Sequence, residues 1–277
     1  DLHSFPTRRS SDLEPGIVEL LSQDRKFSLA DLQQMQGDVL TIPARSLVPL
    51  LKQVRSTKPE VQSAIDELLR WDYQVRADSV PASIYEYWLL KLNPLVYARK
   101  LPESARGYNR YEIRKLIEWL RNPDSGFGAD PTAQRDRILV TAMEQALENL
   151  RALLGSDPGQ WQWGKIHKVP FKHPLWTPEN ASVFDIPSIP RGGDLYTIML
   201  TGGAKPKDAH QDVGASISYV FDVQDWDRSV GLNTPGNESS VGSPHYADLA
   251  AAWGRNEAFP IAFSKQKVKE VSNSRRF

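Results

Sequence analysis

The sequence predicts an α+β fold with a helical first half and a β-rich second half. From Ile17 to about Leu154, apolar residues recur three or four positions apart, which is the period of a helix with one buried face. Beyond Pro158 the content of Gly, Pro, Ser, Thr and aromatic residues rises, and the apolar period changes to two, as in half-buried strands. We therefore divide the chain into a helical region, 14–157, and a β-rich region, 158–277.

The helices predicted for the first region combine this apolar period with capping and breaking signals. The best marked is the last one, because Asp130 and Pro131 have the form of an N-cap followed by a proline in the first turn. The apolar stripes are interpreted as core rather than as cofactor sites. The predicted helices cover Ser28–Met35, Ala44–Val54, Pro59–Leu69, Ala82–Tyr97, Tyr111–Leu120 and Thr132–Leu154.

In the second region three segments are predicted to be strands. Residues 216–223 alternate between polar and apolar side chains, which indicates a half-buried strand with an apolar face of Ile217, Tyr219, Phe221 and Val223. Leu195–Thr201 is an apolar run between two glycine pairs, and Trp161–Phe171 is the third segment. Pro235-Gly236 predicts a turn, and Tyr246–Trp253 predicts a short helix.

Composition excludes several classes of protein. The 277 residues carry 34 Lys and Arg against 34 Asp and Glu, whereas a nucleic-acid-binding protein needs a basic surface to displace phosphate counterions. No window of 18 consecutive apolar residues predicts a transmembrane helix. The sequence has no cysteine, which excludes disulfides, thiolate zinc sites and a cysteine nucleophile. The lack of cysteine does not choose a compartment.

Motif spacing alone predicts no enzyme. His167 and His173 lie six residues apart, roughly 20 Å along a strand, which is too far for one metal ion unless the chain bends. Neither a dinucleotide fingerprint nor a Walker loop occurs. Ser264-Lys265-Gln266-Lys267 matches S-x-x-K but lacks the motifs that accompany it in β-lactamases. Ser243-Pro244-His245 brings a hydroxyl near an imidazole, but the proline is better explained as fixing a turn.

Residues 1–13 read DLHSFPTRRSSDL and differ from the rest of the chain. The segment resembles the translation of a common sequencing adapter, and on that interpretation it carries no structure and the natural sequence before Glu14 is missing. A disordered basic arm and a targeting peptide are the other interpretations. The segment has no apolar stretch of the kind that a secretory signal requires.

A series of motifs resembles the penicillin acylase family. The strongest is Trp161-Gln162-Trp163-Gly164-Lys165-Ile166-His167, followed by Phe171-Lys172-His173-Pro174-Leu175, which is similar to a run in the large chain of that family. Departures occur at Thr41, where serine is common, and at Pro235-Gly236-Asn237-Glu238-Ser239, where P-G-Q-S-G is usual. The resemblance extends over Glu14–Val268 and also includes Phe27-Ser28, Gln36-Gly37-Asp38, Leu69-Arg70-Trp71-Asp72, Gly214-Ala215-Ser216, Asp222, Asp225-Trp226-Asp227, Ser243-Pro244-His245-Tyr246, Trp253, Pro260 and Phe263-Ser264.

The resemblance implies part of an N-terminal-nucleophile (Ntn) hydrolase with the αββα fold. In that family autoproteolysis frees a serine at the start of the large chain, and the α-amino group of this serine acts as its general base. An asparagine and a backbone amide form the oxyanion hole, and the intact enzyme binds calcium. Those residues all lie before the matched region, and Asp1 has no hydroxyl. No catalytic, cofactor-binding or metal-binding residue is therefore assigned in this chain.

The matched aromatic and polar residues either line the acyl pocket or support the strands behind it, and the second interpretation is favoured. A buried indole or imidazole needs hydrogen-bond partners whether or not it has a functional role. His245 is the first to inspect, since it follows a proline in a turn. The residues expected to be structural are Trp163, Gly164, His167, His173, Asp225, Trp226, Ser243, His245 and Tyr246.

The expected function is that of a C-terminal fragment of an amidohydrolase that cleaves linear amide side chains of β-lactams or acyl-homoserine lactones. We expect it to be inactive alone, because the N-terminal serine is missing. Its expected partners are the small-molecule amide and the missing portion of the same precursor, with no nucleic acid and no membrane span. The parent protein is expected to be periplasmic or extracellular. The alternative is a complete non-catalytic α+β module that binds a ligand or partner.

Overall fold

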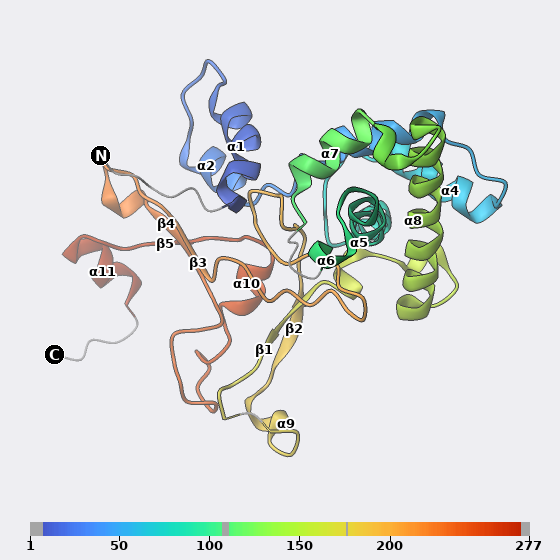
Figure 1. Cartoon of the computed structure of the whole chain (residues 1–277). Helices are drawn as coiled ribbons and strands as arrows, with labels where there is room; N and C mark the ends of the chain where they lie inside the picture. Colours follow the sequence, from blue (N-terminus) through green and yellow to red (C-terminus); the bar gives the residue numbers. More distant parts are fainter. Residues whose placement is uncertain (1–7, 107–110, 176, 273–277) are drawn as a thin grey trace.

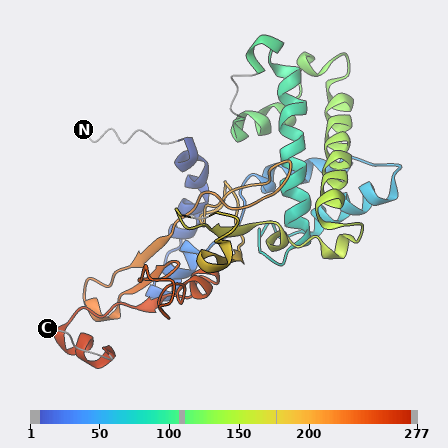
Figure 2. The ribbon, with the colours of Figure 1, turned by 90° about the horizontal axis from the view of Figure 1, so that it is seen from below.

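The structure is a computed structural model that describes residues 8–106, 111–175 and 177–272. Helices dominate the first half and short strands lie in the second, so the predicted α+β organisation is confirmed. Figure 2 shows the helical and β-rich regions side by side, with loops between them. The helices are α1 Arg8–Leu21, α2 Leu29–Gln36, α3 Ala44–Leu47, α4 Pro59–Arg70, α5 Val80–Lys100, α6 Glu103–Arg106, α7 Ile113–Arg121, α8 Pro131–Leu154, α9 Ala181–Phe184, α10 Ala250–Gly254 and α11 Lys265–Val271. The 3-10 helices are η1 Val48–Gln53, η2 Ser125–Phe127, η3 Pro158–Gln160, η4 Trp163–Lys165 and η5 Trp226–Arg228. The strands are β1 Lys168–Phe171, β2 Ile186–Pro190, β3 Ile217–Val220, β4 Val230–Asn233 and β5 Phe259–Pro260.

The helical region is built around α5, which Figure 1 shows nearly end-on with α4, α7 and α8 around it. Almost every face of α5 is buried. The Trp88 indole N–H donates to the Leu139 carbonyl at 3.1 Å and joins α5 to α8. Asp130 caps α8 by accepting from the Ala133 N–H at 3.0 Å, as its sequence predicts.

Two parts of this region differ most from the sequence prediction. The helix predicted over Ala44–Val54 is divided into α3 and the 3-10 helix η1, because Pro49 has no N–H to donate to the preceding turn. Helix α1 begins at Arg8, inside the segment 1–13 that was expected to lack structure, and residues 1–7 lie outside the described residues. Helix α2 agrees with the prediction, because Ser28 and Asp31 form a complete capping box.

The β-rich region contains two small antiparallel sheets among the described residues. One pairs β1 with β2, and the other has the order β3–β4–β5. The strand predicted over Trp161–Phe171 is shorter in the structure. Trp161 and Trp163 lie at 3-10 turns, and only Lys168–Phe171 is extended. Leu195–Thr201 was wrongly predicted as a strand. The Asp194 carboxylate and the Thr197 hydroxyl accept nearby backbone N–H groups and hold this segment in turns.

The period predicted for residues 216–223 is correct, but the buried face is the opposite one. Ile217, Tyr219 and Phe221 are 47%, 40% and 53% exposed, whereas Val220 is 6% exposed. Alternation identifies which residues share a face of a strand but not which face is covered. The helix predicted over Tyr246–Trp253 begins only at Ala250.

Loop 191–204 belongs to the β-rich region and packs against the helical region. The Gly193 N–H donates to the Val75 carbonyl at 2.7 Å, just before α5. A Cβ on Gly192 would stand 2.5 Å from that same carbonyl oxygen, so only glycine permits this close approach. Among the described residues, no helix is both long enough and apolar enough to cross a lipid bilayer.

Candidate functional site

A stacked pair of rings, Trp163 and His167, lies where loop 191–204 meets the start of β1. Both side chains are fully buried, and their ring centroids are 4.6 Å apart. The Trp163 indole N–H donates to the Gly193 carbonyl at 3.1 Å. Neighbouring Gly164 leaves no room for a side chain, since a Cβ would stand 2.9 Å from the Ala77 Cβ. The WxWGxxH motif thus holds the 191–204 loop against the segment that precedes α5.

The His167 imidazole lies between two carbonyl oxygens. Its Nδ1 is 3.1 Å from the Arg191 oxygen, and its Nε2 is 2.8 Å from the Gly202 oxygen. A neutral ring has only one N–H and can donate to only one of them. Burial lowers the pKa of His167 to about 4. The two carbonyl contacts raise this pKa, and the Arg191 charge lowers it slightly, but burial has the largest effect. The ring is therefore neutral at pH 7, and it can donate to only one of the two carbonyls.

Glu86 and Asp194 form a buried carboxyl pair next to this loop. Glu86 Oε2 accepts from the Ala204 N–H at 3.2 Å, and Asp194 Oδ1 accepts from the Tyr196 N–H at 2.6 Å. Burial raises the pKa of both groups, and the Asp194 charge raises that of Glu86 further. The Thr41 hydroxyl next to Asp194 lowers the pKa of this carboxyl group and so opposes the effect of its burial. Burial and the neighbouring Asp194 charge therefore favour the protonated form of Glu86.

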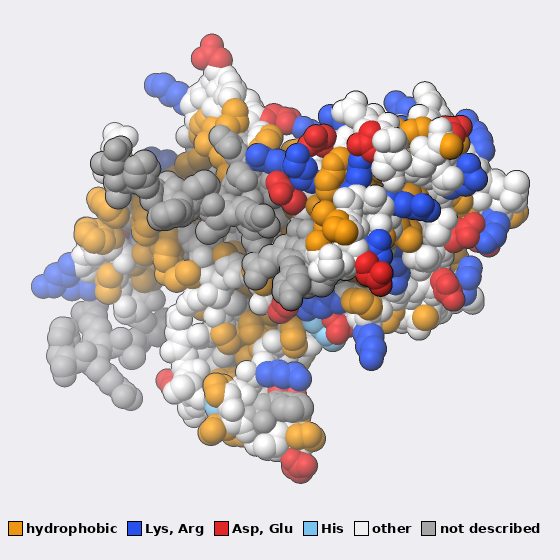
Figure 3. Space-filling view, in the orientation of Figure 1, with side chains coloured by type: hydrophobic (Ala, Val, Ile, Leu, Met, Phe, Trp, Pro, Cys, Tyr) orange, Lys and Arg blue, Asp and Glu red, His pale blue; other side chains and the backbone are white. Residues whose placement is uncertain are grey.

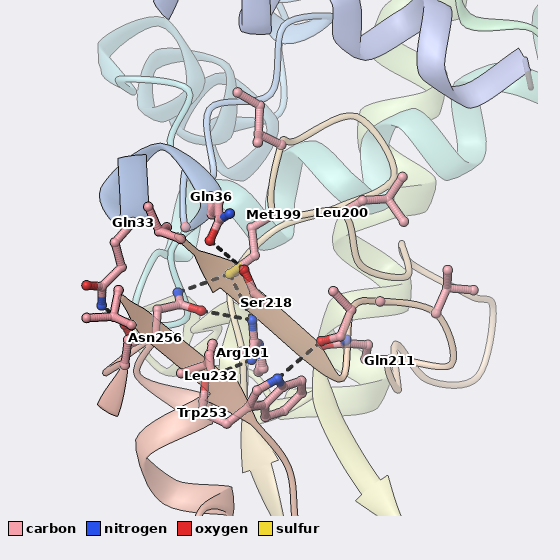
Figure 4. A pocket seen from close by; sticks show the side chains of 18 residues that line it. Gln33, Gln36, Arg191, Met199, Leu200, Gln211, Ser218, Leu232, Trp253 and Asn256 are labelled. Carbon is pink, nitrogen blue, oxygen red and sulfur yellow. Dashed lines mark hydrogen bonds between the residues drawn. The ribbon is translucent and has the colours of Figure 1, made fainter. Parts of the chain in front are cut away.

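A cavity of about 240 Å³ lies between α2, the inner face of β3 and β4, and the end of α10. Figure 4 shows Arg191 among the residues that line it, with Met199, Trp253 and Asn256 in contact. Arg191 is 3% exposed, and its guanidinium stacks on the Trp253 indole at 3.8 Å. Burial lowers the pKa of Arg191 to about 10, so the side chain is cationic at pH 7. The cavity therefore combines apolar walls with a buried positive charge.

Ser243, His245 and Asp248 do not form a catalytic triad. His245 Nδ1 is 2.7 Å from Asp248 Oδ2, but the Ser243 oxygen accepts from the His245 backbone N–H at 3.1 Å rather than from the ring. The His245 side chain is 70% exposed. A nucleophilic serine would need its hydroxyl on the free ring nitrogen, and this geometry does not place it there.

The other family-motif residues occupy separate places. His173 stacks on Phe184 at 4.5 Å, and the Tyr246 hydroxyl donates to the Phe184 carbonyl at 2.8 Å. Asp225 is exposed and caps η5 through the Asp227 N–H. The structure thus brings Trp163, Gly164 and His167 together, joins His173 to Tyr246 through α9, and leaves Asp225, Trp226, Ser243 and His245 on the surface.

Sequence reasoning missed Arg191, Glu86 and Asp194. A charged residue inside the apolar run Ile84–Trp88 is a signal for a buried carboxyl group. Arg191 and Asp194 bracket a Gly-Gly pair in an otherwise apolar stretch, which is a similar signal for a tight buried turn. Their partners come from other elements, so the sequence could not show the pairing.

An exposed cluster of rings covers the outer side of β3, and we call Tyr219, Phe221, Trp226 and Phe263 the aromatic face. Successive ring centroids are 5.4, 5.9 and 5.5 Å apart. Figure 3 shows hydrophobic side chains gathered over these strands. Next to it, α1, α2 and β3 enclose an apolar groove of about 520 Å³. The aromatic face and this groove together form an extended exposed apolar surface.

No group of three potential metal-ligating side chains occurs in residues 8–106, 111–175 and 177–272. The calcium expected for the intact family enzyme stays a prediction. Asp1 lies outside the described residues.

The fold is similar to that of the thermostable penicillin G acylase of Alcaligenes faecalis, which has the Ntn-hydrolase fold, with a TM-score of 0.54 and 16% identity. That match covers 97% of this chain and 52% of the acylase chain. The penicillin amidase family model matches residues 14–270. The chain belongs to the penicillin amidase family.

Curated relatives in the same family are longer proteins. The penicillin acylase 2 proenzyme of Pseudomonas sp. strain SE83 is 28% identical over 91% of this chain and 33% of its own length. The acyl-homoserine lactone acylase QuiP of Pseudomonas fluorescens Pf-5 is 28% identical over 92% of this chain and 33% of its own length. QuiP of Pseudomonas aeruginosa is 24% identical over 97% and 34%. The chain therefore spans about a third of the length of the relatives that it matches.

Proposed function

We propose that this chain is the C-terminal part of the large chain of an amide-hydrolysing acylase, and that it supplies scaffold rather than the nucleophile. The observation that carries this proposal is the family match over residues 14–270 combined with the coverage of about a third of each relative. In this role the motif residues Trp163, Gly164 and His167 hold loop 191–204 in place. Hydrolysis needs the serine and oxyanion hole of the preceding portion.

The aromatic face supports the proposal, because four exposed rings have no cover in the described residues. Burying them against the preceding portion of the precursor would stabilise both parts by the hydrophobic effect. Alone, the chain keeps this surface in water and is expected to self-associate. The substrates of the whole enzyme would be linear amides of the types that the relatives' names carry, a penicillin or an acyl-homoserine lactone, and the parent protein would be periplasmic or extracellular and bind calcium.

The first test reads the genomic DNA upstream of the codon for Glu14. We expect an open reading frame that continues upstream and contains a serine at a processing site. An initiator methionine directly before Asp1 would overturn the proposal and favour a complete binding module.

The second test measures amide hydrolysis by the purified 277-residue chain with a chromogenic phenylacetyl anilide. No turnover above the uncatalysed rate is expected, with a penicillin acylase as the positive control. Turnover that persists after Ser243→Ala and His245→Ala would show a nucleophile elsewhere in this chain. Turnover abolished by these variants would place it at the exposed Ser243 loop. Either result would contradict the proposal that the chain is inactive alone.

A further inference from the structure

Segment 194–201, which we call the strap, forms one wall of the cavity and lies between two glycine pairs. Gly192-Gly193 precedes the strap and Gly202-Gly203 follows it. Gly193 has a φ of 84°, a conformation that glycine adopts readily. Small residues at both ends of a segment are suited to the dihedral changes of a hinge motion. The strap residues that line the cavity are Ile198, Met199 and Leu200.

The buried carboxyl pair spans the contact between the strap and α5. Glu86 on α5 is 5% exposed, and Asp194 at the start of the strap is fully buried. At the other end of the strap, Glu86 Oε2 accepts from the Ala204 N–H at 3.2 Å, and a Cβ on Gly203 would stand 3.2 Å from the same oxygen. Both ends of the strap therefore meet α5 at Glu86.

The charge state of Glu86 decides how favourable this contact is. While Glu86 is protonated, the pair buries at most one charge, and the two side chains hydrogen-bond to each other. In the described residues neither carboxyl group has a salt bridge to a Lys, Arg or His side chain. Ionisation of Glu86 removes the donor and places two negative charges side by side in a buried site, which is unfavourable.

The other titratable groups near the pair do not supply a compensating charge. Burial raises the pKa of Tyr85 and Tyr87, the neighbours of Glu86 on α5, so both phenols are neutral at pH 9. Tyr196 on the strap also faces this site. His167 holds the carbonyl that follows the strap, and burial lowers its pKa to about 4, so the ring is neutral at pH 6 and above. An effect that begins above pH 6 is therefore not due to His167.

The strap can move more easily than α5 can. Almost every face of α5 is buried, and Trp88 bonds it to α8. The strap is attached by local backbone contacts, in which the Met199 N–H donates to the Asp38 carbonyl at 2.9 Å and Thr201 forms an isolated bridge with Gly214. Outward movement of the strap would separate the two carboxylates, bring water to both and remove one wall of the cavity.

We propose that the strap is a pH-dependent cover of the cavity, which turns outward at its two glycine pairs when Glu86 and Asp194 are both ionised at alkaline pH. The strap stays closed while Glu86 is protonated. This device does not depend on amide hydrolysis, so its test and the test of the proposed function have separate outcomes.

The test is hydrogen–deuterium exchange of the 277-residue chain at pH 6 and pH 9, read by mass spectrometry on peptides from the strap and from α8. The peptide from α8 is the internal reference, since no residue of α8 lines the cavity. We expect the ratio of strap exchange to α8 exchange to rise about tenfold between pH 6 and pH 9, the change that corresponds to one pKa unit.

Glu86→Gln assigns the effect to the carboxyl pair, because glutamine keeps the shape of a protonated Glu86 and does not ionise. At pH 9 the strap should exchange about tenfold more slowly in Glu86→Gln than in the unaltered chain, and at pH 6 the two should agree within about twofold. Comparison at one pH removes the intrinsic pH dependence of amide exchange. Glu148→Gln, an exposed position on α8, is the matched control and should leave strap exchange unchanged.

Asp194→Asn provides a second variant if Glu86→Gln does not fold, as judged by circular dichroism. It removes the other charge of the pair and should also slow strap exchange at pH 9. A constant ratio of strap to α8 exchange in the unaltered chain would overturn the proposal, whichever variants fold. Equal strap exchange at pH 9 in the unaltered chain and in a folded Glu86→Gln or Asp194→Asn variant would overturn it as well.

Discussion

The helical region and the β-rich region differ in how completely they bury their apolar side chains. Among the described residues, the largest fully buried side chains lie almost all in the helical region, and Trp163 is the exception. Most large exposed apolar side chains lie in the β-rich region. A helix satisfies its own backbone hydrogen bonds, whereas a strand needs neighbours. The first region thus closes its own core, whereas the second leaves much of its apolar surface exposed.

The largest expected effect comes from breaking the core of the helical region. Trp88→Ala removes a fully buried indole and its hydrogen bond to the Leu139 carbonyl. The variant should lose about 3–5 kcal/mol of unfolding free energy. Urea unfolding monitored by far-UV circular dichroism measures this loss. Arg99→Ala, an exposed position on the same helix, should change stability by less than about 0.5 kcal/mol, and a similar loss there would contradict the assignment of the core to α5.

A smaller loss of stability is expected at acid pH, because His167 in the β-rich region has a lowered pKa. The pKa of this group is about 4 in the folded chain and 6.5 in the unfolded chain. The unfolded state therefore binds the proton first, and stability is lost as pH falls from about 6.5 to about 4. The loss should approach about 3 kcal/mol. Urea midpoints measured between pH 7 and pH 4 should show it.

His167→Gln tests the assignment, because this variant should remove most of the loss below pH 6.5. Glu86 acts in the opposite direction. Burial raises its pKa, so its contribution to stability is present at low pH and declines as pH rises above the unfolded value of 4.5. The Glu86→Gln variant should therefore still lose stability as the pH falls below 6.5. If the His167→Gln variant lost as much stability between pH 6.5 and pH 4 as the unaltered chain, the role given to the imidazole would be wrong.

A third prediction concerns the junction between the regions. Gly164→Ala places a Cβ 2.9 Å from the Ala77 Cβ and 3.0 Å from both the Ala77 oxygen and the Pro190 Cβ. Overpacking of this kind should cost about 1–3 kcal/mol. Gly242→Ala is the matched control, since its Cβ would have nothing within 4 Å. Equal melting temperatures for the two variants would show that the structure around Gly164 accommodates the extra methyl group without strain.

The smallest effect on stability is expected at the aromatic face. Phe221→Thr should change the unfolding free energy by less than about 0.5 kcal/mol, because the ring is 53% exposed. It should nevertheless reduce self-association in light scattering and sedimentation. Val271→Thr, an exposed apolar position on α11, serves as the control. Equal reduction by both variants would mean that the face has no special role.

Helices were more predictable than strands because their signals are local. Ser28 and Asp130 mark helix starts within three residues of the N–H groups that they cap. The family motifs were also recognisable, since eight or more short matches occur in register. The match to the family over residues 14–270 confirms that inference.

The strand region and the candidate site depend on distant contacts that sequence periodicity does not contain. The apolar run Leu195–Thr201 predicts a strand, but Asp194 and Thr197 hydrogen-bond to nearby backbone and hold it in turns. The outward orientation of Tyr219 depends on what covers β3. Arg191 receives its environment from Met199, Trp253 and Asn256, the last two more than sixty residues away in sequence.

The pleat of β3 sends adjacent side chains to two different environments. Ser218 and Val220 line the small cavity, whereas Ile217 and Tyr219 are exposed on the outer face. As homologous sequences diverge, the even columns of this strand should covary with residues around Arg191, and the odd columns with a surface encoded elsewhere in the gene. Four consecutive residues would thus carry two separate evolutionary records.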